Sequence, residues 1–259
     1  MIRSGMTSVT LRHLSWQRVL HCAAEAGLSG IEWGGDIHVP PGDIELAQRV
    51  KNATAAAGLS VLSYGSYYRV GCSLKGTDGF TPLLASAVAL EAPVIRVWAG
   101  DKGSQEADAA WLQRVAEDTE RIVELAAKEE IQVAYEFHGG TLTDSGESAV
   151  RLLRQVKSPI RTYWQPSVGL TVSQRLAELE AVLPWLICLH VFHWRDRERL
   201  PLAEGEEEWA QYLALLPADD EFSAVLEFVK GDKPEQLRVD AATLHDLLEK
   251  KEAAKKPTE

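Results

Sequence analysis

The sequence has few cysteines, no excess of positive charge and no long apolar run. Cys22, Cys72 and Cys188 lie far apart without paired spacing, which argues against a disulfide framework or a thiolate zinc site and predicts reduced thiols. A formal charge of −11 would repel a phosphate backbone, so we expect no nucleic-acid partner. No secretory leader and no stretch of about 18 apolar residues occurs, so we expect a soluble, cytoplasmic protein with no membrane partner and a small-molecule substrate.

The sequence does contain a regular alternation of short β-branched or aromatic runs with longer segments of helical periodicity. This alternation is typical of parallel βαβ units, and it repeats eight times at a spacing of roughly 30 residues. Segments 15–26, 44–57 and 107–128 carry apolar residues at i, i+3 and i+4 and predict helices of an outer ring. The expected strands are residues 2–6, 30–33, 60–64, 94–98, 132–137, 161–165, 186–193 and 224–228.

Length and breakers favour one closed domain. Gly27 and Gly58 each stand between a predicted helix and the next strand, where a residue with positive φ ends the helix. The 259 residues fit a single domain, 1–259, with 250–259 expected to be a flexible tail. An open doubly wound sheet would use the same elements, but no Gly-x-Gly-x-x-Gly follows the first strand. We therefore predict an α/β fold of the (β/α)8 type, the TIM barrel.

Polar residues end the fifth to eighth predicted strands, whose C-terminal ends converge on one mouth of such a barrel. Side-chain alternation places Glu136 on the same face as the small Ala134, and a carboxylate among apolar neighbours requires a cation or hydrogen-bond donors. Two carboxylates, one imidazole and one amide suit Mn²⁺ or Mg²⁺, with Zn²⁺ or Co²⁺ as alternatives. The opposing interpretation is a set of solvated strand-end residues. The four residues are Glu136, Gln165, His193 and Glu227.

Four segments carry a resemblance to a known family: GLSGIEWGGDIHVP, SYGSYYRVG, RVWAGDKGS and YEFHGGTLTDSGESA. Together they resemble the sugar phosphate isomerase/epimerase superfamily, the xylose isomerase-like barrels, over nearly the whole chain. The resemblance implies one divalent cation held by Glu136, His193 and Glu227, and proton transfer by the two glutamates. Gln165 stands where the family usually has Asp, which implies weaker metal binding. Val168 stands where the family commonly has His, which implies one substrate contact fewer.

Further residues are candidates for contacts with the substrate. His138 lies on the same strand face as Glu136, and Glu32 is either a mouth residue or part of an ion pair. The opposite parity of His190 to His193 predicts that His190 packs against the helices rather than binding the metal. His190 is therefore kept only as a reserve ligand. The candidate substrate-binding residues are His38, His138, Trp98, Arg199, Arg96, Tyr64 and Glu32, in which the arginines would bind an anion and the aromatic rings would wall the pocket.

The leading hypothesis is a metal-dependent isomerase or epimerase acting on a small sugar or polyol, phosphorylated or not. An inosose-type dehydratase would use the same metal and glutamates but expel water. A non-catalytic sugar-binding barrel is the third hypothesis. DNA repair of the endonuclease IV type is disfavoured, since that resemblance would require several more His, Asp and Glu ligands for three zinc ions. The oligomeric state is left open, a homo-oligomer included.

Overall fold

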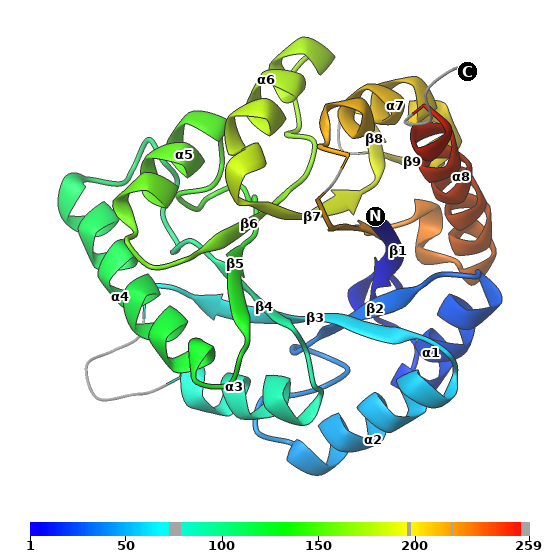
Figure 1. Ribbon diagram of the computed structural model, residues 1–259, viewed down its shortest axis with the longest axis horizontal. Coiled ribbons are helices and arrows are strands. Elements are labelled where there is room, and N and C mark those ends of the chain that lie inside the picture. The colour runs from blue at the N-terminus through cyan, green and yellow to red at the C-terminus, as the bar shows by residue number, and fades with distance from the viewer. Residues whose placement is uncertain (73–78, 196–197, 219, 255–259) are drawn as a thin grey trace.

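The computed structural model describes residues 1–72, 79–195, 198–218 and 220–254. Eight parallel strands form a closed ring in the order β1-β10-β7-β6-β5-β4-β3-β2, with the helices outside it (Figure 1). The TIM barrel predicted from the sequence is confirmed. The strands of the ring are β1 (Ile2–Thr7), β2 (Gly30–Gly34), β3 (Ser60–Arg69), β4 (Val94–Trp98), β5 (Gln132–Tyr135), β6 (Arg161–Trp164), β7 (Leu186–Val191) and β10 (Phe222–Leu226).

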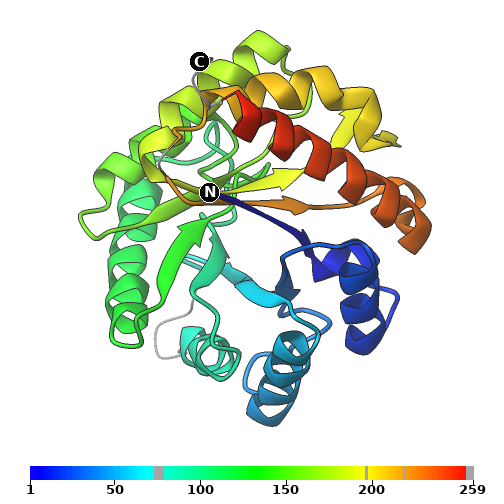
Figure 2. The same cartoon turned by 45° about the vertical axis from the view of Figure 1, so that its right-hand side comes forward.

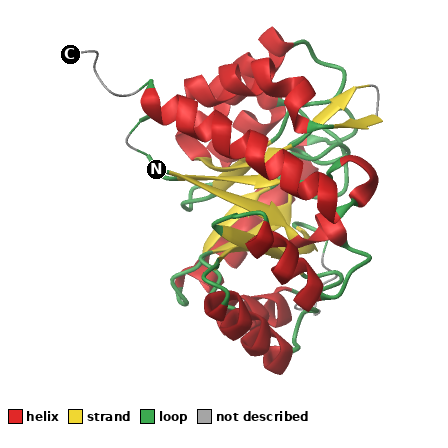
Figure 3. Ribbon diagram, turned by 90° about the vertical axis from the view of Figure 1, so that its right-hand side faces the viewer, coloured by secondary structure: helices red, strands yellow, loops and turns green. Residues whose placement is uncertain are grey.

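The helices surround the strands on all sides, as the rotated views show (Figures 2 and 3). They are α1 (Trp16–Glu25), α2 (Ile44–Ala56), α3 (Phe80–Ala89), α4 (Ala109–Ala127), α5 (Gly146–Gln155), α6 (Val172–Val182), α7 (Glu206–Leu215) and α8 (Pro234–Ala253). Four short 3₁₀ helices complete the described elements: η1 (Ser8–Leu11), η2 (Leu183–Trp185), η3 (Leu202–Gly205) and η4 (Lys230–Asp232). Among the described helices, none combines the length and the apolar character needed to cross a membrane.

Local sequence signals set the helix boundaries. The side chains of Ser15, Asp108 and Thr171 accept a hydrogen bond from a backbone N–H in the first turn of the helix that follows each of them. Gly27 and Gly58 have φ of 67° and 75°, as predicted for residues that end a helix. Of the predicted tail 250–259, residues 250–253 belong to α8, and residues 255–259 lie outside the described part of the chain.

The apolar residues form two clusters separated by the strands. The larger cluster lies between the ring and the helices and includes Val133, Tyr135 and Leu226. The smaller one fills the interior of the ring and comprises Leu62, Val94, Ala134, Tyr163, Cys188 and Val225. Because side chains alternate along a regular strand, the residues two positions after these interior side chains also face inward, closer to the C-terminal mouth, in every strand except β3. The register of β3 shifts at Leu62, and Tyr64 belongs to the larger cluster.

A separate antiparallel hairpin follows β7. It consists of β8 (His193–Arg195) and β9 (Glu198–Leu200), which pair with each other and not with the ring. The seventh strand of the barrel therefore ends at Val191, two residues before the predicted end at His193. The alternation of the ring does not extend into the hairpin, and this changes which histidine reaches the interior.

Candidate active site

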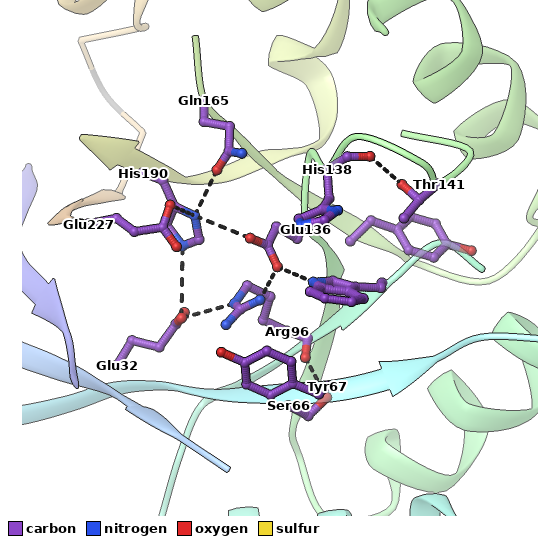
Figure 4. Close-up of polar contacts among 12 residues, drawn as sticks. Glu32, Ser66, Tyr67, Arg96, Glu136, His138, Thr141, Gln165, His190 and Glu227 are labelled. Atoms are coloured by element: carbon purple, nitrogen blue, oxygen red, sulfur yellow. Dashed lines mark hydrogen bonds and ion pairs between the residues drawn. The ribbon is translucent and has the colours of Figure 1, made fainter. Parts of the chain in front are cut away.

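Four side chains meet at the C-terminal end of the barrel, one each from β7 and the residues just after β5, β6 and β10. The Nδ1 atom of His190 lies 3.0 Å from Gln165 Oε1, 3.2 Å from Glu227 Oε2 and 3.7 Å from Glu136 Oε1 (Figure 4). Ligand atoms of Glu136, His190 and Glu227 all lie within 4.8 Å of one another. Three oxygen acceptors thus surround one nitrogen, more than a single N–H can satisfy, which is an arrangement suited to a cation.

The imidazole at this point is His190, and the prediction that His193 would occupy it was wrong. His190 follows the interior Cys188 by two residues and is fully buried. His193 instead begins the hairpin and packs on η3, where a Cβ atom at Gly205 would lie 2.3 Å from its Nδ1. Burial lowers the pKa of His193, and its Nε2 has no hydrogen-bond partner among the described residues. The inference that His190 packs against the helices was also wrong. It counted parity from His193, which lies beyond the end of β7 at Val191.

A buried arginine joins two glutamates behind this point. Arg96 Nε donates to Glu32 Oε1 at 2.9 Å, and Arg96 Nη1 donates to Glu136 Oε2. Ser63 Oγ donates to the other oxygen of Glu32 at 2.7 Å. Of the two interpretations offered for Glu32, a mouth residue or part of an ion pair, the structure supports the ion pair. Arg96 is 2% exposed and already occupied by carboxylates, so the structure does not support its predicted role in binding a substrate anion.

A glycine allows the pair to form across β3. A Cβ atom at Gly65 would lie 2.7 Å from Arg96 Nη2 and 2.8 Å from Glu32 Oε1. Both distances are shorter than real Cβ contacts, so any other residue at this position would displace the arginine or the glutamate. Burial would raise the pKa of Glu32, but the Arg96 guanidinium and His190 outweigh it and hold that pKa well below its ordinary value.

The charges of the buried cluster match a divalent cation. Three carboxylates, those of Glu32, Glu136 and Glu227, face one guanidinium, that of Arg96, so the net charge is −2 when His190 is neutral. Burial alone would lower the pKa of His190, but the carboxylates of Glu227 and Glu32 outweigh it and raise the pKa to about 10. A protonated His190 and a bound divalent ion are two ways of balancing the same negative charge. The donors therefore fit a divalent metal in number, chemistry and charge.

A cavity of about 560 Å³ opens above the cluster. Its polar floor includes Glu136, Gln165 and Glu227, and its wall is largely aromatic. The aromatic residues that line it are Tyr67, Trp98, Phe137, Phe192, Trp194 and Phe228. Phe228 has φ of 56°, an uncommon backbone conformation for a non-glycine residue, immediately after Glu227.

Trp98 and His138, two of the candidate substrate-binding residues, form one side of the cavity. Their rings stack with centroids 4.3 Å apart and an interplanar angle of 26°. Trp98 Nε1 donates to Glu136 Oε2 at 2.5 Å. His138 Nδ1 lies 2.7 Å from the carbonyl oxygen of Gly139, which only accepts, so Nδ1 carries the proton. The Nε2 atom is therefore the ring nitrogen of His138 that is left to exchange a proton with a ligand.

The structure does not place three other predicted substrate contacts at the cavity. His38 is 3% exposed; Ser8 Oγ accepts from Gly34 N–H and donates to His38 Nδ1 at 2.9 Å, while His38 Nε2 donates to Leu14 O at 3.1 Å. Burial lowers its pKa. These bonds make His38 a structural histidine of the loop after β2.

Tyr64 and Arg199 are also turned to other partners. Tyr64 is buried between the ring and the helices and donates its hydroxyl to Val39 O at 2.8 Å. Arg199 pairs with Asp232 and lies over the ring of Phe228, 4.5 Å from its centroid. Arg199 thus supports the cavity wall from behind.

Sequence reasoning missed several residues of the cavity, among them Tyr67 and Arg12. Arg12 Nη2 donates to Asp36 Oδ2 at 2.5 Å and to the Tyr67 hydroxyl at 3.3 Å. Burial raises the pKa of Tyr67 to about 12. The β3 strand extends to Arg69, beyond its predicted end at residue 64, which brings Tyr67 to the mouth. The signal available was the aromatic pair in SYGSYYRVG.

Comparison with known proteins gives a curated relative and structures of the same fold. The chain is 27% identical over 165 residues to a 3-dehydroshikimate dehydratase of Bacillus anthracis, a match spanning 61% of this chain and 59% of the relative. The structure resembles that of the probable 3-DHS dehydratase from the same organism, with a TM-score of 0.76, 21% identity and coverage of 95% and 99% of the two chains. It also resembles D-psicose 3-epimerase of Clostridium cellulolyticum, with a TM-score of 0.70, 13% identity and coverage of 96% and 99%.

These structural likenesses at low identity concern the fold. The family itself is shown by a sequence model that matches residues 20–228, a range that contains all four converging side chains. The resemblance seen in the sequence is thereby confirmed, and the chain belongs to the xylose isomerase-like TIM barrel family.

Proposed function

We propose that this protein is a divalent-metal-dependent enzyme that removes a proton from a carbon next to a carbonyl group in a small, polyhydroxylated substrate. The observation that carries the proposal is the convergence of Glu136, Gln165, His190 and Glu227 on one point at the floor of an aromatic-walled cavity. Those four side chains would hold the ion. When bound, the ion supplies polarisation of the carbonyl oxygen and stabilises the negative charge that develops there.

The side chains of the chain itself would transfer the protons. The buried carboxylate of Glu227 lines the cavity and is placed to remove the proton from the carbon. When His138 is an imidazolium, the proton on Nε2, the ring nitrogen not bonded to Gly139, is placed for donation to a departing hydroxyl, which leaves His138 neutral with its proton on Nδ1. The surrounding aromatic rings would exclude water and pack against the C–H faces of the substrate.

We favour elimination of water as the outcome. The electrons of the broken C–H bond form a C=C bond, and the hydroxyl on the next carbon leaves as water with the proton from His138. Two observations support elimination: the similarity to a 3-dehydroshikimate dehydratase and the presence of an acid, His138, beside the cavity. Isomerisation or epimerisation is the second candidate, favoured by the similarity of the fold to a D-psicose 3-epimerase.

The product distinguishes the two candidates. Protein loaded with Mn²⁺ would be incubated with ketoses, inososes and cyclic hydroxy ketones that carry a carboxylate, with and without phosphate, and products would be analysed by mass spectrometry. Elimination gives a product lighter by one water, and isomerisation or epimerisation gives a product of unchanged mass. Binding of sugars without turnover and without uptake of Mn²⁺ would contradict the enzymatic proposal and support a sugar-binding barrel.

A further inference from the structure

We infer that Trp98 and Arg96 fix Glu136 as a ligand that uses one oxygen, so that Glu227 is the only carboxylate of the site that moves a proton. The inference rests on the proposed function and assigns different tasks to the two glutamates. It starts from a difference between their hydrogen bonds.

Both donors to Glu136 act on the same oxygen. Trp98 Nε1 lies 2.5 Å from Glu136 Oε2, and Arg96 Nη1 bonds to that atom as well. Oε1 is left facing the point of convergence, 3.7 Å from His190 Nδ1. With Oε2 occupied by two donors and Oε1 directed to the cation, Glu136 has no oxygen left to receive a proton from carbon.

The donors are themselves held in place. The Trp98 ring is stacked with His138, and the Arg69 guanidinium lies over it, 4.3 Å from its centroid. Arg96 is anchored by its second bond, to Glu32. The main chain of Glu136 is fixed too, since its N–H donates to Val97 O at 2.9 Å. The orientation of the carboxylate is therefore determined before any ion binds.

The main chain of Glu227 is held in the same way, by its N–H bond to Val191 O at 3.0 Å, but its carboxylate has no comparable restraint. Within the described residues its carboxylate contacts one cationic group, His190, at 3.2 Å, and Arg96 does not bond to it. With an ion bound, one oxygen of Glu227 can ligate while the other remains available. A single base removes and returns a proton on one face of the substrate, whereas inversion at that carbon requires a second acid on the opposite face. The assignment therefore favours elimination over epimerisation by two glutamates.

Matched amide variants test the assignment by Mn²⁺ binding, measured by calorimetry. In Glu136→Gln the two donors hold the amide oxygen at the Oε2 position and turn the NH₂ group toward the cation, which repels it. In Glu227→Gln the side chain is free to turn its oxygen inward, so mainly one charge is lost. We expect Glu136→Gln to weaken Mn²⁺ binding roughly tenfold or more beyond Glu227→Gln, while Glu227→Gln abolishes exchange of the substrate C–H proton with D₂O.

A pair of tryptophans provides the second arm. Trp98→Phe removes the donor to Glu136 and keeps a ring in the stack. Trp194→Phe is the control, because Trp194 lines the same cavity and has Arg199 over its ring, but its Nε1 has no hydrogen-bond partner among the described residues. We expect Trp98→Phe to weaken Mn²⁺ binding by about 10- to 100-fold and Trp194→Phe to change it far less, with both variants folded by circular dichroism.

The outcomes separate the inference from the function. Wild-type protein that binds no Mn²⁺ would overturn the proposed function and the inference with it. Wild-type protein that binds Mn²⁺, with equal losses in the two glutamine variants or in the two phenylalanine variants, would overturn only the inference. Retained exchange of the substrate C–H proton in Glu227→Gln would likewise overturn only the inference.

Discussion

Binding of a divalent ion should displace one proton from His190. The carboxylates around this imidazole raise its pKa to about 10, so the metal-free site is protonated at neutral pH, and the same Nδ1 faces the proposed ligands. At pH 7.5 the proton must leave a site whose pKa is about 2.5 units higher, which weakens apparent metal binding roughly 300-fold relative to the deprotonated site. Apparent affinity should therefore rise about tenfold per pH unit below pH 10.

Calorimetric titration with Mn²⁺ at pH 6.5, 7.5 and 8.5 measures the affinity at each pH. Repeating the titration in two buffers of different ionisation enthalpy measures the number of protons released. We expect about one proton released per ion bound. His190→Asn should lose the proton release and most of the affinity, whereas His193→Asn, altered three positions away on the hairpin, should retain both. Affinity independent of pH with no proton released, or loss of binding in His193→Asn and not in His190→Asn, would refute the reasoning.

Three further predictions concern charge, packing and burial. Gln165→Asp should tighten Mn²⁺ binding about tenfold or more, because it adds a negative charge 3.0 Å from His190 Nδ1; weaker binding by calorimetry would contradict a ligand role for residue 165. Gly65→Ala should lower the free energy of unfolding by about 1–3 kcal/mol, because its Cβ would collide with the Arg96–Glu32 pair; a melting temperature equal to that of wild type would contradict this. Burial lowers the pKa of His38, so the unfolded chain binds more protons than the folded chain below about pH 6.5, and the free energy of unfolding should decline there. In urea titrations at pH 5 and 7, His38→Leu should remove this part of the decline. The same variant should leave Mn²⁺ binding unchanged.

The alternation of strand-like and helical segments was enough to predict the fold, and side-chain alternation along single strands was enough to predict the direction of two carboxylates. Glu136 follows the interior Ala134, and Glu227 follows the interior Val225, because both strands are regular through those residues. An acid at the end of a strand that is apolar on both faces can point either to the interior mouth or to the helix layer. The small Ala134, two positions before Glu136, indicated that Glu136 points to the interior.

The same rule failed at the seventh strand because its end was placed too late. An apolar run continues through Phe192, so the sequence does not mark Val191 as the last residue of the strand. Parity counted back from His193 then put His190 on the wrong face. The register that settles the question, His190 paired with Val225 of β10, is a contact between distant segments that no local pattern contains.

The buried ion pair was only partly predictable. Arg96 and Glu32 each lie within an apolar strand, and burial of a single charge is unfavourable enough that each needed a partner of opposite sign. That reasoning allowed Glu32 as an ion pair but did not reveal that Arg96 is shared with Glu136, which follows the neighbouring strand β5. The sharing depends on the order of strands β2 to β5 in the ring and on the missing side chain at Gly65, which are properties of the assembled structure.

The β8–β9 hairpin makes one part of the mouth separable from the framework. Within the described part of the chain, its two strands pair only with each other. Trp194 nevertheless reaches the cavity, while His193 packs on Gly205 and Arg199 pairs with Asp232. Exchange of this segment between relatives would alter the shape of the substrate chamber without interrupting the continuous hydrogen bonding of the eight strands. The hairpin is thus a natural place for members of one fold to diverge in substrate preference while keeping a common set of ligands.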